Sequence, residues 1–401
     1  MRVALYGGTF NPPHIGHLLT VKTLSETFDR VIVMPAAIPP HKPLPENSFS
    51  AAERLELSRL TFGGFNNVEV SDLEINKNQI CYTIDTMDAL DIDDLTLVIG
   101  TDMLLSLEEW YRFEDILKRA KIAVLRRDGR SVTEHIDHLI TRYNANVTLI
   151  DTNIVEISST QLRLTGALSI QSPVPAAPPP PEGVFRGNGG VASGQAPCRA
   201  KASADAGTRA PVPPYPRAAR LKILKTIHPK RLAHSLGAES EAIRLAEHYG
   251  ADAKDAALAA LLHDCTKHWT VERHLQYCEE CNIITNKAFS DIPKLLHSVT
   301  AAELARREFQ VSDSVYGAIR HHTVGRCEMS ELELIVYLAD KLEPTREYKD
   351  VPGYREIAYE SLERATLAIM EMSIRKLMNE GRTIHPATIE ARNYYLEVLT
   401  L

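Results

Sequence analysis

The sequence predicts two domains of different fold class, an α/β domain with a parallel sheet followed by an all-α domain. Three observations lead to this prediction. Strand-like and helix-like segments alternate over residues 1–165, a tract rich in Pro, Gly and Ala follows, and apolar residues then recur at helical spacing. We therefore divide the chain into an N-terminal domain at 1–169, a flexible linker at 170–220 and a C-terminal domain at 221–401.

Short apolar or β-branched runs in the N-terminal domain are predicted to be strands, and the amphipathic stretches between them helices. This alternation is typical of βαβ units, whose parallel sheet is covered by helices on both faces. Ligands of such sheets bind beyond the carboxyl ends of the strands. The expected strands are Val3–Tyr6, Val31–Met34, Val68–Val70, Leu95–Ile99, Ile122–Leu125 and Val147–Ile150, and the clearest helices are Gly16–Phe28, Ser50–Leu60 and Tyr82–Leu90.

The rest of the chain changes character twice. Eleven of the 23 Pro residues lie in 170–220, and Gly, Ala and Ser fill much of the remainder. Such a segment cannot bury enough apolar surface to offset its ordering entropy, so it is predicted to be a flexible, partly polyproline linker. From 221 onward apolar residues such as Ala257, Leu258, Leu261 and Leu262 recur at helical spacing, which predicts an all-α domain.

Composition excludes several classes of protein. Lys and Arg number 45 against 52 Asp and Glu, and this net charge of -7 does not suggest a nucleic-acid partner. No apolar run is long enough to span a bilayer, and the first residues lack the apolar core of a signal peptide. Six Cys in 401 residues are typical of a reducing compartment, so we expect a cytoplasmic protein without a membrane partner. A homo-oligomer is left open.

The segment after the first expected strand, GGTFNPPHIGH at 7–17, combines a tight turn with two histidines. Gly7 and Gly8 let the backbone turn and approach a ligand closely. His14 and His17 are three residues apart, so they share a face where a helix begins. A helix N-terminus suits phosphate, and histidines there can stabilise the charge of nucleotidyl transfer. The alternative is a Gly-rich turn with two incidental surface histidines.

This segment resembles the HxGH motif of the nucleotidylyltransferase superfamily, specifically that of the bacterial nicotinate-nucleotide adenylyltransferases. PAAIPPHK at 35–42, IGTDMLLSLEEWY at 99–111 and ISSTQLR at 157–163 resemble later segments of the same family, in the same order. The resemblance implies a Rossmann-like fold and catalytic roles for His14 and His17. The substrate-binding residues that it implies are Gly7, Gly8, Thr9, Phe10, Lys42, Thr83, Thr86, Gly100, Asp102, Trp110, Ser158, Ser159, Thr160 and Arg163.

The family's reaction joins ATP and nicotinate mononucleotide to give deamido-NAD and pyrophosphate, with Mg²⁺ bound to ATP. Because the mononucleotide phosphate attacks the α-phosphorus in line, the protein mainly positions reactants and stabilises charge. Trp110 would stack on the nicotinate ring, or belong to the core. Asp102 would hold a ribose hydroxyl, or cap a helix. Leu164–Ser172 departs from the family's closing helix, which leaves the activity of this half open.

The C-terminal domain carries histidines and aspartates at the ends of apolar helices. The pair His263–Asp264 follows the run AALAALL, and His234, His297, His322 and Asp340 lie at similar junctions. Imidazole and carboxylate ligands suit Fe, Mn, Co or Zn. One histidine on an apolar face is usually structural, but six such residues at helix junctions favour a metal site.

This pattern resembles that of the HD-domain phosphohydrolases. AHSLG, LLHDCTKH, LLHS, IRHHTVGRCEMS and IVYLADKLEPTRE resemble segments of the YqeK family, the HD-type symmetrical diadenosine tetraphosphate hydrolases, over about 225–385. The resemblance implies that iron or another divalent transition metal is ligated by His234, His263, Asp264 and Asp340. Lys267 would be catalytic. The nucleotide, its phosphates or a second metal would be held by Arg231, His234, Asp264, His297, His322, Thr323, Asp340 and Arg346. His321 is expected to take no part, and His268 and His274 are expected at the surface.

These motifs together predict a fusion of two nucleotide enzymes. The N-terminal half would be an adenylyltransferase of NAD biosynthesis, and the C-terminal half would cleave diadenosine tetraphosphate to two ADP. The expected small-molecule partners are ATP, nicotinate mononucleotide and diadenosine tetraphosphate. A general (d)NTP or NDP phosphohydrolase and a nucleotide-sensing regulatory domain remain alternatives for the C-terminal half. The long linker predicts that the two domains are independent and that proteolysis within 170–220 leaves each active.

Overall fold

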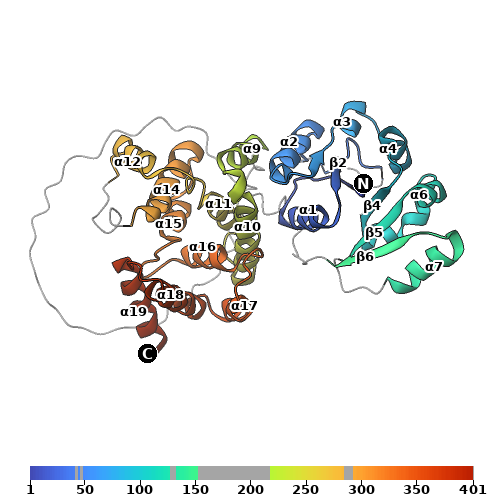
Figure 1. Ribbon diagram of the computed structural model, residues 1–401. Helices are drawn as coiled ribbons and strands as arrows, with labels where there is room; N and C mark the ends of the chain where they lie inside the picture. The colour runs from blue at the N-terminus through green and yellow to red at the C-terminus, as the bar shows by residue number, and fades with distance from the viewer. Residues whose placement is uncertain (41–43, 46–47, 127–131, 152–216, 284–291, 401) are drawn as a thin grey trace, which may run out of the picture.

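The computed structural model describes residues 1–40, 44–45, 48–126, 132–151, 217–283 and 292–400. It contains an N-terminal domain with a central sheet and a C-terminal domain of helices (Figure 1). Lys42 and the segment that holds Ser158, Ser159, Thr160, Arg163 and Leu164–Ser172 lie outside the described residues. Among the described helices, none combines the length and the apolar character needed to cross a bilayer.

The N-terminal sheet confirms the predicted parallel architecture. Its strands lie in the order β3-β2-β1-β4-β5-β6, and every neighbouring pair is parallel. Each observed strand contains the predicted one and extends it by two residues at most. The strands are β1 (Val3–Gly8), β2 (Arg30–Pro35), β3 (Val68–Val70), β4 (Leu95–Gly100), β5 (Lys121–Arg126) and β6 (Val147–Asp151).

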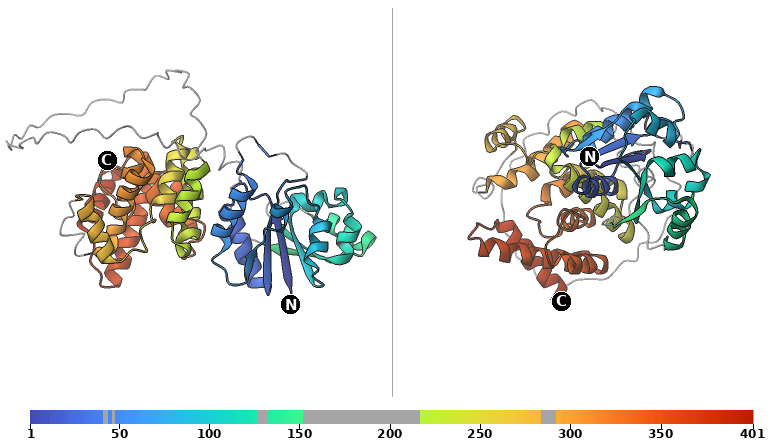
Figure 2. Two further views of the ribbon diagram at one scale, coloured as in Figure 1. Left: turned by 90° about the horizontal axis from the view of Figure 1, so that it is seen from above. Right: turned by 45° about the vertical axis from the view of Figure 1, so that its right-hand side comes forward.

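Helices cover both faces of this sheet because side chains alternate along each strand. Ala4 and Tyr6 of β1 belong to the core under α1 (Ile15–Thr27) and α2 (Ala51–Phe62), whereas Val3 and Leu5 belong to the core on the opposite face. Figure 2 shows the two helical layers on either side of the sheet. The opposite layer contains α4 (Thr83–Leu90), α5 (Thr101–Leu105), η1 (Leu107–Glu109), α6 (Phe113–Arg119) and α7 (Thr133–Tyr143), and α3 (Leu73–Lys77) precedes it in the chain.

The strand order reverses between β1 and β4, which pair in register from Val3 opposite Leu95 to Tyr6 opposite Val98. Parallel α/β sheets bind ligands at such a reversal, beyond the carboxyl ends of the strands. Here these ends carry the glycines Gly7 and Gly8 on β1 and Gly100 on β4. The topology therefore places the predicted phosphate-binding turn at the edge where a ligand is expected.

The C-terminal domain is all-α, as predicted. Its core is built around α10, which packs on α11 and α16, and contains many alanines that let these helices approach closely. The helices are α9 (Arg217–Thr226), α10 (Pro229–Tyr249), α11 (Ala253–Leu262), α12 (Val271–Glu280), α14 (Leu296–Phe309), α15 (Asp313–His321), α16 (Glu331–Leu342), α17 (Val351–Glu360), α18 (Leu362–Asn379) and α19 (Pro386–Thr400), with the short η2 (Pro293–Leu295).

Helix α9 begins at Arg217, inside the range 170–220 that the sequence analysis assigned to the linker. The guanidinium of Arg220 is buried and donates to both carboxylate oxygens of Glu239 on α10, at 2.6 and 2.9 Å. Because this bidentate pair fixes α9 on α10, the last residues of the expected linker belong structurally to the C-terminal domain.

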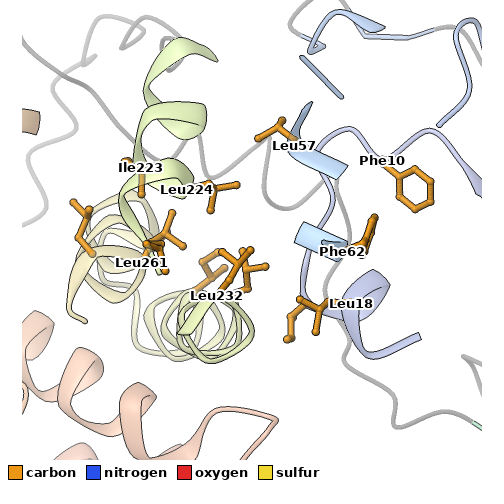
Figure 3. Packing of buried hydrophobic residues seen from close by; sticks show 14 of the residues in the cluster. Phe10, Leu18, Leu57, Phe62, Ile223, Leu224, Leu232 and Leu261 are labelled. Carbon is orange, nitrogen blue, oxygen red and sulfur yellow. The ribbon is translucent and has the colours of Figure 1, made fainter. Parts of the chain in front are cut away.

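The two domains share a continuous apolar core where α9 and α10 meet α1 and α2. Leu18 and Leu57 of the N-terminal domain and Leu224 and Leu232 of the C-terminal domain belong to the same buried cluster (Figure 3). The sequence analysis did not anticipate this contact, because it treated the linker as the only connection between the halves.

Candidate functional sites

A cavity of about 460 Å³ opens at the carboxyl ends of β1 and β4. Nine of the predicted substrate-binding or catalytic residues line it, including the glycine turn and Trp110. These are Gly7, Gly8, Thr9, Phe10, His17, Thr83, Gly100, Asp102 and Trp110. Glu74 and Cys81 also line the cavity and were not singled out from the sequence, which gives neither residue a recognisable motif position.

His14 and His17 form a reciprocal cap at the start of α1. The Nδ1 atom of His14 accepts from the backbone N–H of Gly16 at 3.1 Å, and Nδ1 of His17 accepts from the backbone N–H of His14 at 3.3 Å. The two rings lie 3.8 Å apart between centroids. Because both Nδ1 atoms accept from the backbone, a neutral ring of either histidine carries its proton on Nε2.

The glycine turn is held in shape by side-chain packing. Phe10 has a φ of 47° and its ring contacts Phe62 and His17 edge-on, at 5.5 and 5.0 Å between centroids. A Cβ on Gly8 would lie 2.9 Å from the Phe10 ring, so only glycine fits there. Phe10 thereby connects the turn to the His17 ring.

Arg54 holds the backbone of the glycine turn in place, a role that was not predicted from the sequence. Its buried guanidinium donates to Thr9 O at 2.7 Å, Ala36 O at 2.6 Å and Ala37 O at 2.8 Å, and within the described part of the chain its partners are backbone carbonyls. Burial lowers the pKa of Arg54. These bonds connect the glycine turn to the segment that follows β2, and both contribute residues to the cavity lining. A single arginine on an amphipathic helix offers no sequence signal for this role.

The remaining predicted residues of the N-terminal domain differ in whether they line the cavity. Thr86 is buried and donates to Glu74 Oε1 at 2.7 Å, so it supports the cavity wall rather than lining the cavity. Asp102 lies in the first turn of α5, whose N-cap is Gly100, so the alternative of Asp102 as the cap does not hold. Trp110 is only 9% exposed and packs into the core while also lining the cavity, which combines both roles considered for it.

The predicted metal ligands of the C-terminal domain converge in one buried cluster. His234, His263, Asp264 and Asp340 each offer a ligand atom, and these atoms all lie within 4.8 Å of one another. His234 lies on α10, the His263–Asp264 pair directly follows α11, and Asp340 lies on α16. The Nε2 atom of His234 is 3.0 Å from Nε2 of His263 and 3.1 Å from Asp340 Oδ1.

A second group of possible ligands shares the same aspartate. Asp264, His297 and His322 also converge within 4.8 Å. The Oδ1 atom of Asp264 lies 3.1 Å from His297 Nε2 and 3.5 Å from His322 Nε2, whereas its Oδ2 atom faces His234 at 3.4 Å. One carboxylate therefore lies between two sets of imidazoles, a position suited to bridging two cations.

All four histidines of the cluster present Nε2 inward because each Nδ1 has an acceptor on the outside. Nδ1 of His263, His297 and His322 donates to backbone carbonyls at 2.6, 2.5 and 2.7 Å. Nδ1 of His234 lies 3.1 Å from Glu343 Oε1. Since carbonyl oxygens only accept, the Nε2 atoms carry lone pairs. Outer hydrogen bonds of this kind orient metal-ligating histidines.

The protonation states of the cluster also fit a cation. Burial holds the pKa of His263 and His297 well below the usual value and lowers the pKa of His322 to about 3. Burial alone would raise the pKa of Asp340, but the adjacent Lys341 ammonium and the hydrogen bonds from His234 and His263 together outweigh it and hold this pKa well below the usual value. The Nε2 atoms of His234 and His263 lie 3.0 Å apart and those of His297 and His322 lie 3.2 Å apart, which is close enough for the two members of each pair to coordinate one cation.

Four cationic side chains surround the cluster on its solvent side. Arg231 and Lys267 pair with Asp264, and Lys341 and Arg346 pair with Asp340. They keep between 22% and 36% of their side-chain surface exposed, whereas the two carboxylates are buried, so the cations lie between the cluster and solvent. Among the described residues, Arg231 Nε and Thr323 Oγ1 are buried without a hydrogen-bond partner. Such orphaned donors suit an anionic ligand.

Two residues of this centre were missed from the sequence, and one expectation was wrong. Glu343 orients His234, and Lys341 contacts Asp340, although neither stands at a position that single-sequence reasoning distinguishes. His274 was expected at the surface, but it is buried and bonds Thr300 through Nδ1 at 2.9 Å. His321 lies outside both groups of ligands and pairs with Glu333.

Comparisons with known proteins agree with this division. Residues 5–165 match the cytidylyltransferase-like family, and residues 231–345 match the HD domain. A protein of Caldicellulosiruptor saccharolyticus named probable nicotinate-nucleotide adenylyltransferase is 39% identical over 174 residues, which cover 41% of this chain and 85% of that protein. The chain belongs to the nicotinate-nucleotide adenylyltransferase family. A Caldicellulosiruptor bescii relative of the same name is 36% identical, with 41% and 85% coverage.

The C-terminal domain is an HD domain, as the sequence motifs predicted. It is similar to a Clostridium acetobutylicum protein whose crystal structure is described as that of a predicted HD superfamily hydrolase involved in NAD metabolism. The two are 36% identical, and the match covers 44% of this chain and 94% of that one, with a TM-score of 0.43. The chain thus joins an adenylyltransferase-family domain to an HD domain.

Proposed function

We propose that the chain carries two activities on nucleotides. The N-terminal domain transfers AMP from ATP to nicotinate mononucleotide, giving deamido-NAD and pyrophosphate. The HD domain cleaves diadenosine tetraphosphate symmetrically to two ADP. The His14–His17 cap beside the cavity supports the first assignment, and the shared carboxylate of Asp264 under a layer of cations supports the second.

In the N-terminal domain the chain positions two substrates and stabilises charge. The Nε2–H groups of His14 and His17 donate to phosphoryl oxygens as negative charge develops in the transition state. The positive end of the α1 helix dipole adds favourable potential at the same place. Trp110, which also lines the cavity, stacks on the nicotinate ring. Mg²⁺ would enter with ATP.

The test of the first assignment is an assay of the full chain for pyrophosphate release with ATP and nicotinate mononucleotide. Replacing this substrate with nicotinamide mononucleotide measures the selectivity for the carboxylate. Product formation that depends on nicotinate mononucleotide supports the assignment. Its absence in protein that still hydrolyses polyphosphates would contradict it and leave the second assignment standing.

In the HD domain, His234, His263, Asp264 and Asp340 would hold a divalent transition metal, and His297 and His322 would hold a second with Asp264. A divalent ion in this position supplies Lewis acidity toward phosphoryl oxygens. Nitrogen and oxygen ligands of this kind suit iron, manganese, cobalt or zinc.

The cationic layer favours a substrate rich in phosphate. The Arg346 guanidinium and the Lys267 ammonium lie at the opening of the buried cluster and neutralise the polyphosphate. Arg231 and Thr323 supply buried donors that still lack partners among the described residues. Water adds to one of the two central phosphorus atoms, the central P–O–P bond breaks, and the second ADP leaves.

The test of the second assignment compares diadenosine tetraphosphate with dGTP as substrates of the full chain loaded with Fe²⁺, Mn²⁺ or Zn²⁺. Release of ADP as the sole nucleotide product from the tetraphosphate supports symmetrical cleavage. Faster hydrolysis of dGTP favours a general phosphohydrolase. Tight binding without hydrolysis under any metal favours a sensor domain. Asp264→Ala serves as the inactive control.

A further inference from the structure

We propose that helices α9 and α10 dock permanently on helices α1 and α2, which makes the HD domain a structural support of the nucleotide-binding turn. This inference concerns the contact between the domains and goes beyond the two proposed activities. It replaces the expectation of two independent domains on a tether.

The contact has an apolar centre contributed by both domains. Leu57 points from α2 toward α9, and Leu18 points from α1 toward α10, where Leu224 and Leu232 face them (Figure 3). All four leucines are at most 4% exposed. Phe62 lies five positions after Leu57 on α2 and turns the other way, toward Phe10. Helix α2 therefore has one apolar face for its own domain and another for the HD domain.

An ion pair crosses the same contact. Lys225 Nζ on α9 lies 2.6 Å from Glu56 Oε1 on α2, next to the buried Leu224 and Leu57. Both side chains are about half exposed, so the pair adds little to the stability of the contact. The ion pair contributes mainly to the specificity of the contact, because it fixes which turns of α9 and α2 face each other. Docking is intramolecular, so the connection between the domains raises the effective concentration of the two apolar faces and adds to the stability of the contact.

The contact reaches both functional sites through adjacent residues. Leu18 follows His17 directly on α1, and Phe62 of α2 contacts Phe10, whose ring packs on His17. On α10, Leu232 lies between Arg231 and the metal-ligand candidate His234. Docking therefore stabilises α1, the helix whose first turn carries the histidine cap. Without docking, Leu18 and Leu57 would be exposed to solvent close to that cap.

Zero-length carbodiimide cross-linking of the intact chain tests the docking directly. This reagent joins a lysine amine to a carboxylate only when the two are in contact, so it should link Lys225 to Glu56 within a monomer. Lys222 and Glu308, 2.9 Å apart within the HD domain and similarly exposed, form the internal control. A Lys222–Glu308 link without a Lys225–Glu56 link, read by peptide mass spectrometry, would overturn the proposal.

A second test cuts the full chain by limited proteolysis between 170 and 216. We expect the two fragments to co-elute in gel filtration at micromolar concentration, and Leu57→Glu to abolish co-elution. Leu149→Glu, at an exposed leucine of β6, is the matched control and should leave the fragments together. Separation of the wild-type fragments, with both still folded by circular dichroism, would overturn the proposal. If Leu57→Glu does not fold, the cross-linking result decides.

Discussion

The Oδ1 atom of Asp264 lies 3.1 Å from Nε2 of His297, while the other oxygen of the same carboxylate faces the imidazoles of His234 and His263. Asp264 is thus the only described residue that belongs to both groups of possible metal ligands. Its side chain is fully buried. Substitutions at Asp264 and at the surrounding histidines should therefore differ in how much metal they release.

We expect Asp264→Ala to lose the metal of both groups and all tetraphosphate hydrolysis, because one carboxylate serves both. His322→Ala should lose only the metal bound by the group that contains His297, and should keep the metal bound by His234 and His263. The measurement is metal content per chain after anaerobic reconstitution. Adenylyl transfer should be unchanged in both variants. Equal losses of metal in the two variants would argue against a bridging role for Asp264.

Glu343→Gln should weaken metal binding by about 10–100-fold, because Glu343 accepts from His234 Nδ1 and fixes the ring with Nε2 inward. Glu343 is itself held by Thr345, whose backbone N–H and hydroxyl both lie 2.6 Å from its carboxylate oxygens. Competition with a chelator measures the affinity. Glu347→Gln, four residues later, is the control and should leave the affinity for metal unchanged. If Glu343→Gln also leaves this affinity unchanged, Glu343 does not orient His234 for metal binding.

His14→Ala and His17→Ala should each lower kcat for adenylyl transfer on the order of 100-fold, as for loss of a preorganised donor. His17→Ala also removes the ring that Phe10 packs against, so its effect should be the larger. Steady-state kinetics on the full chain measure both, and tetraphosphate hydrolysis checks that the fold survives. Near-normal kcat in both variants would exclude the histidines from the chemistry.

Trp110→Ala should raise KM for nicotinate mononucleotide more than KM for ATP, because the indole stacks on only one of the substrates. Trp110 lines the cavity and is otherwise packed in the core, so a loss of thermal stability is expected as well. Trp269→Ala, in the HD domain, is the control and should change neither KM. An equal rise in both KM values would indicate that Trp110 acts only as a core residue.

Acid should destabilise the HD domain through Glu333. Burial alone would raise the pKa of Glu333, but hydrogen bonds from His321, Arg326 and Ser330 outweigh it and lower this pKa to about 2. A depressed carboxyl pKa stabilises the fold above the unfolded value of about 4.5, and this stabilisation is lost as the pH falls from about 4.5 to about 2. A fall of the pKa from about 4.5 to about 2 corresponds to a contribution of about 3 kcal/mol at most.

Chemical denaturation of the metal-free chain across that pH range tests the Glu333 prediction. Glu333→Gln should lower the unfolding free energy of the HD domain at pH 7 and flatten its dependence on pH below 4.5. Glu331→Gln, on the same helix but exposed, should behave like the wild type. Parallel pH profiles for wild type and Glu333→Gln would show that Glu333 does not carry the acid sensitivity.

Local patterns in the sequence determined the elements and the ligand types. The runs from Val3 and Leu95 became strands of a parallel sheet because apolar and β-branched side chains at these positions suit a sheet that is buried on both faces. His263 and Asp264 became ligand candidates because adjacent residues at a helix end can reach one point. Both predictions depend on residues that are close in sequence, so they required no knowledge of the packing.

Only the tertiary structure decided which distant groups meet. Arg54 holds Thr9 and Ala36, and Glu343 orients His234 across more than a hundred residues, which no local pattern encodes. The docking of Leu232 against Leu18 is of the same kind. Helical spacing of apolar residues predicts that they are buried. It does not predict whether they are covered by their own domain or by the other one. Burial of apolar surface is non-directional, so the partner is settled by the shape of the whole chain.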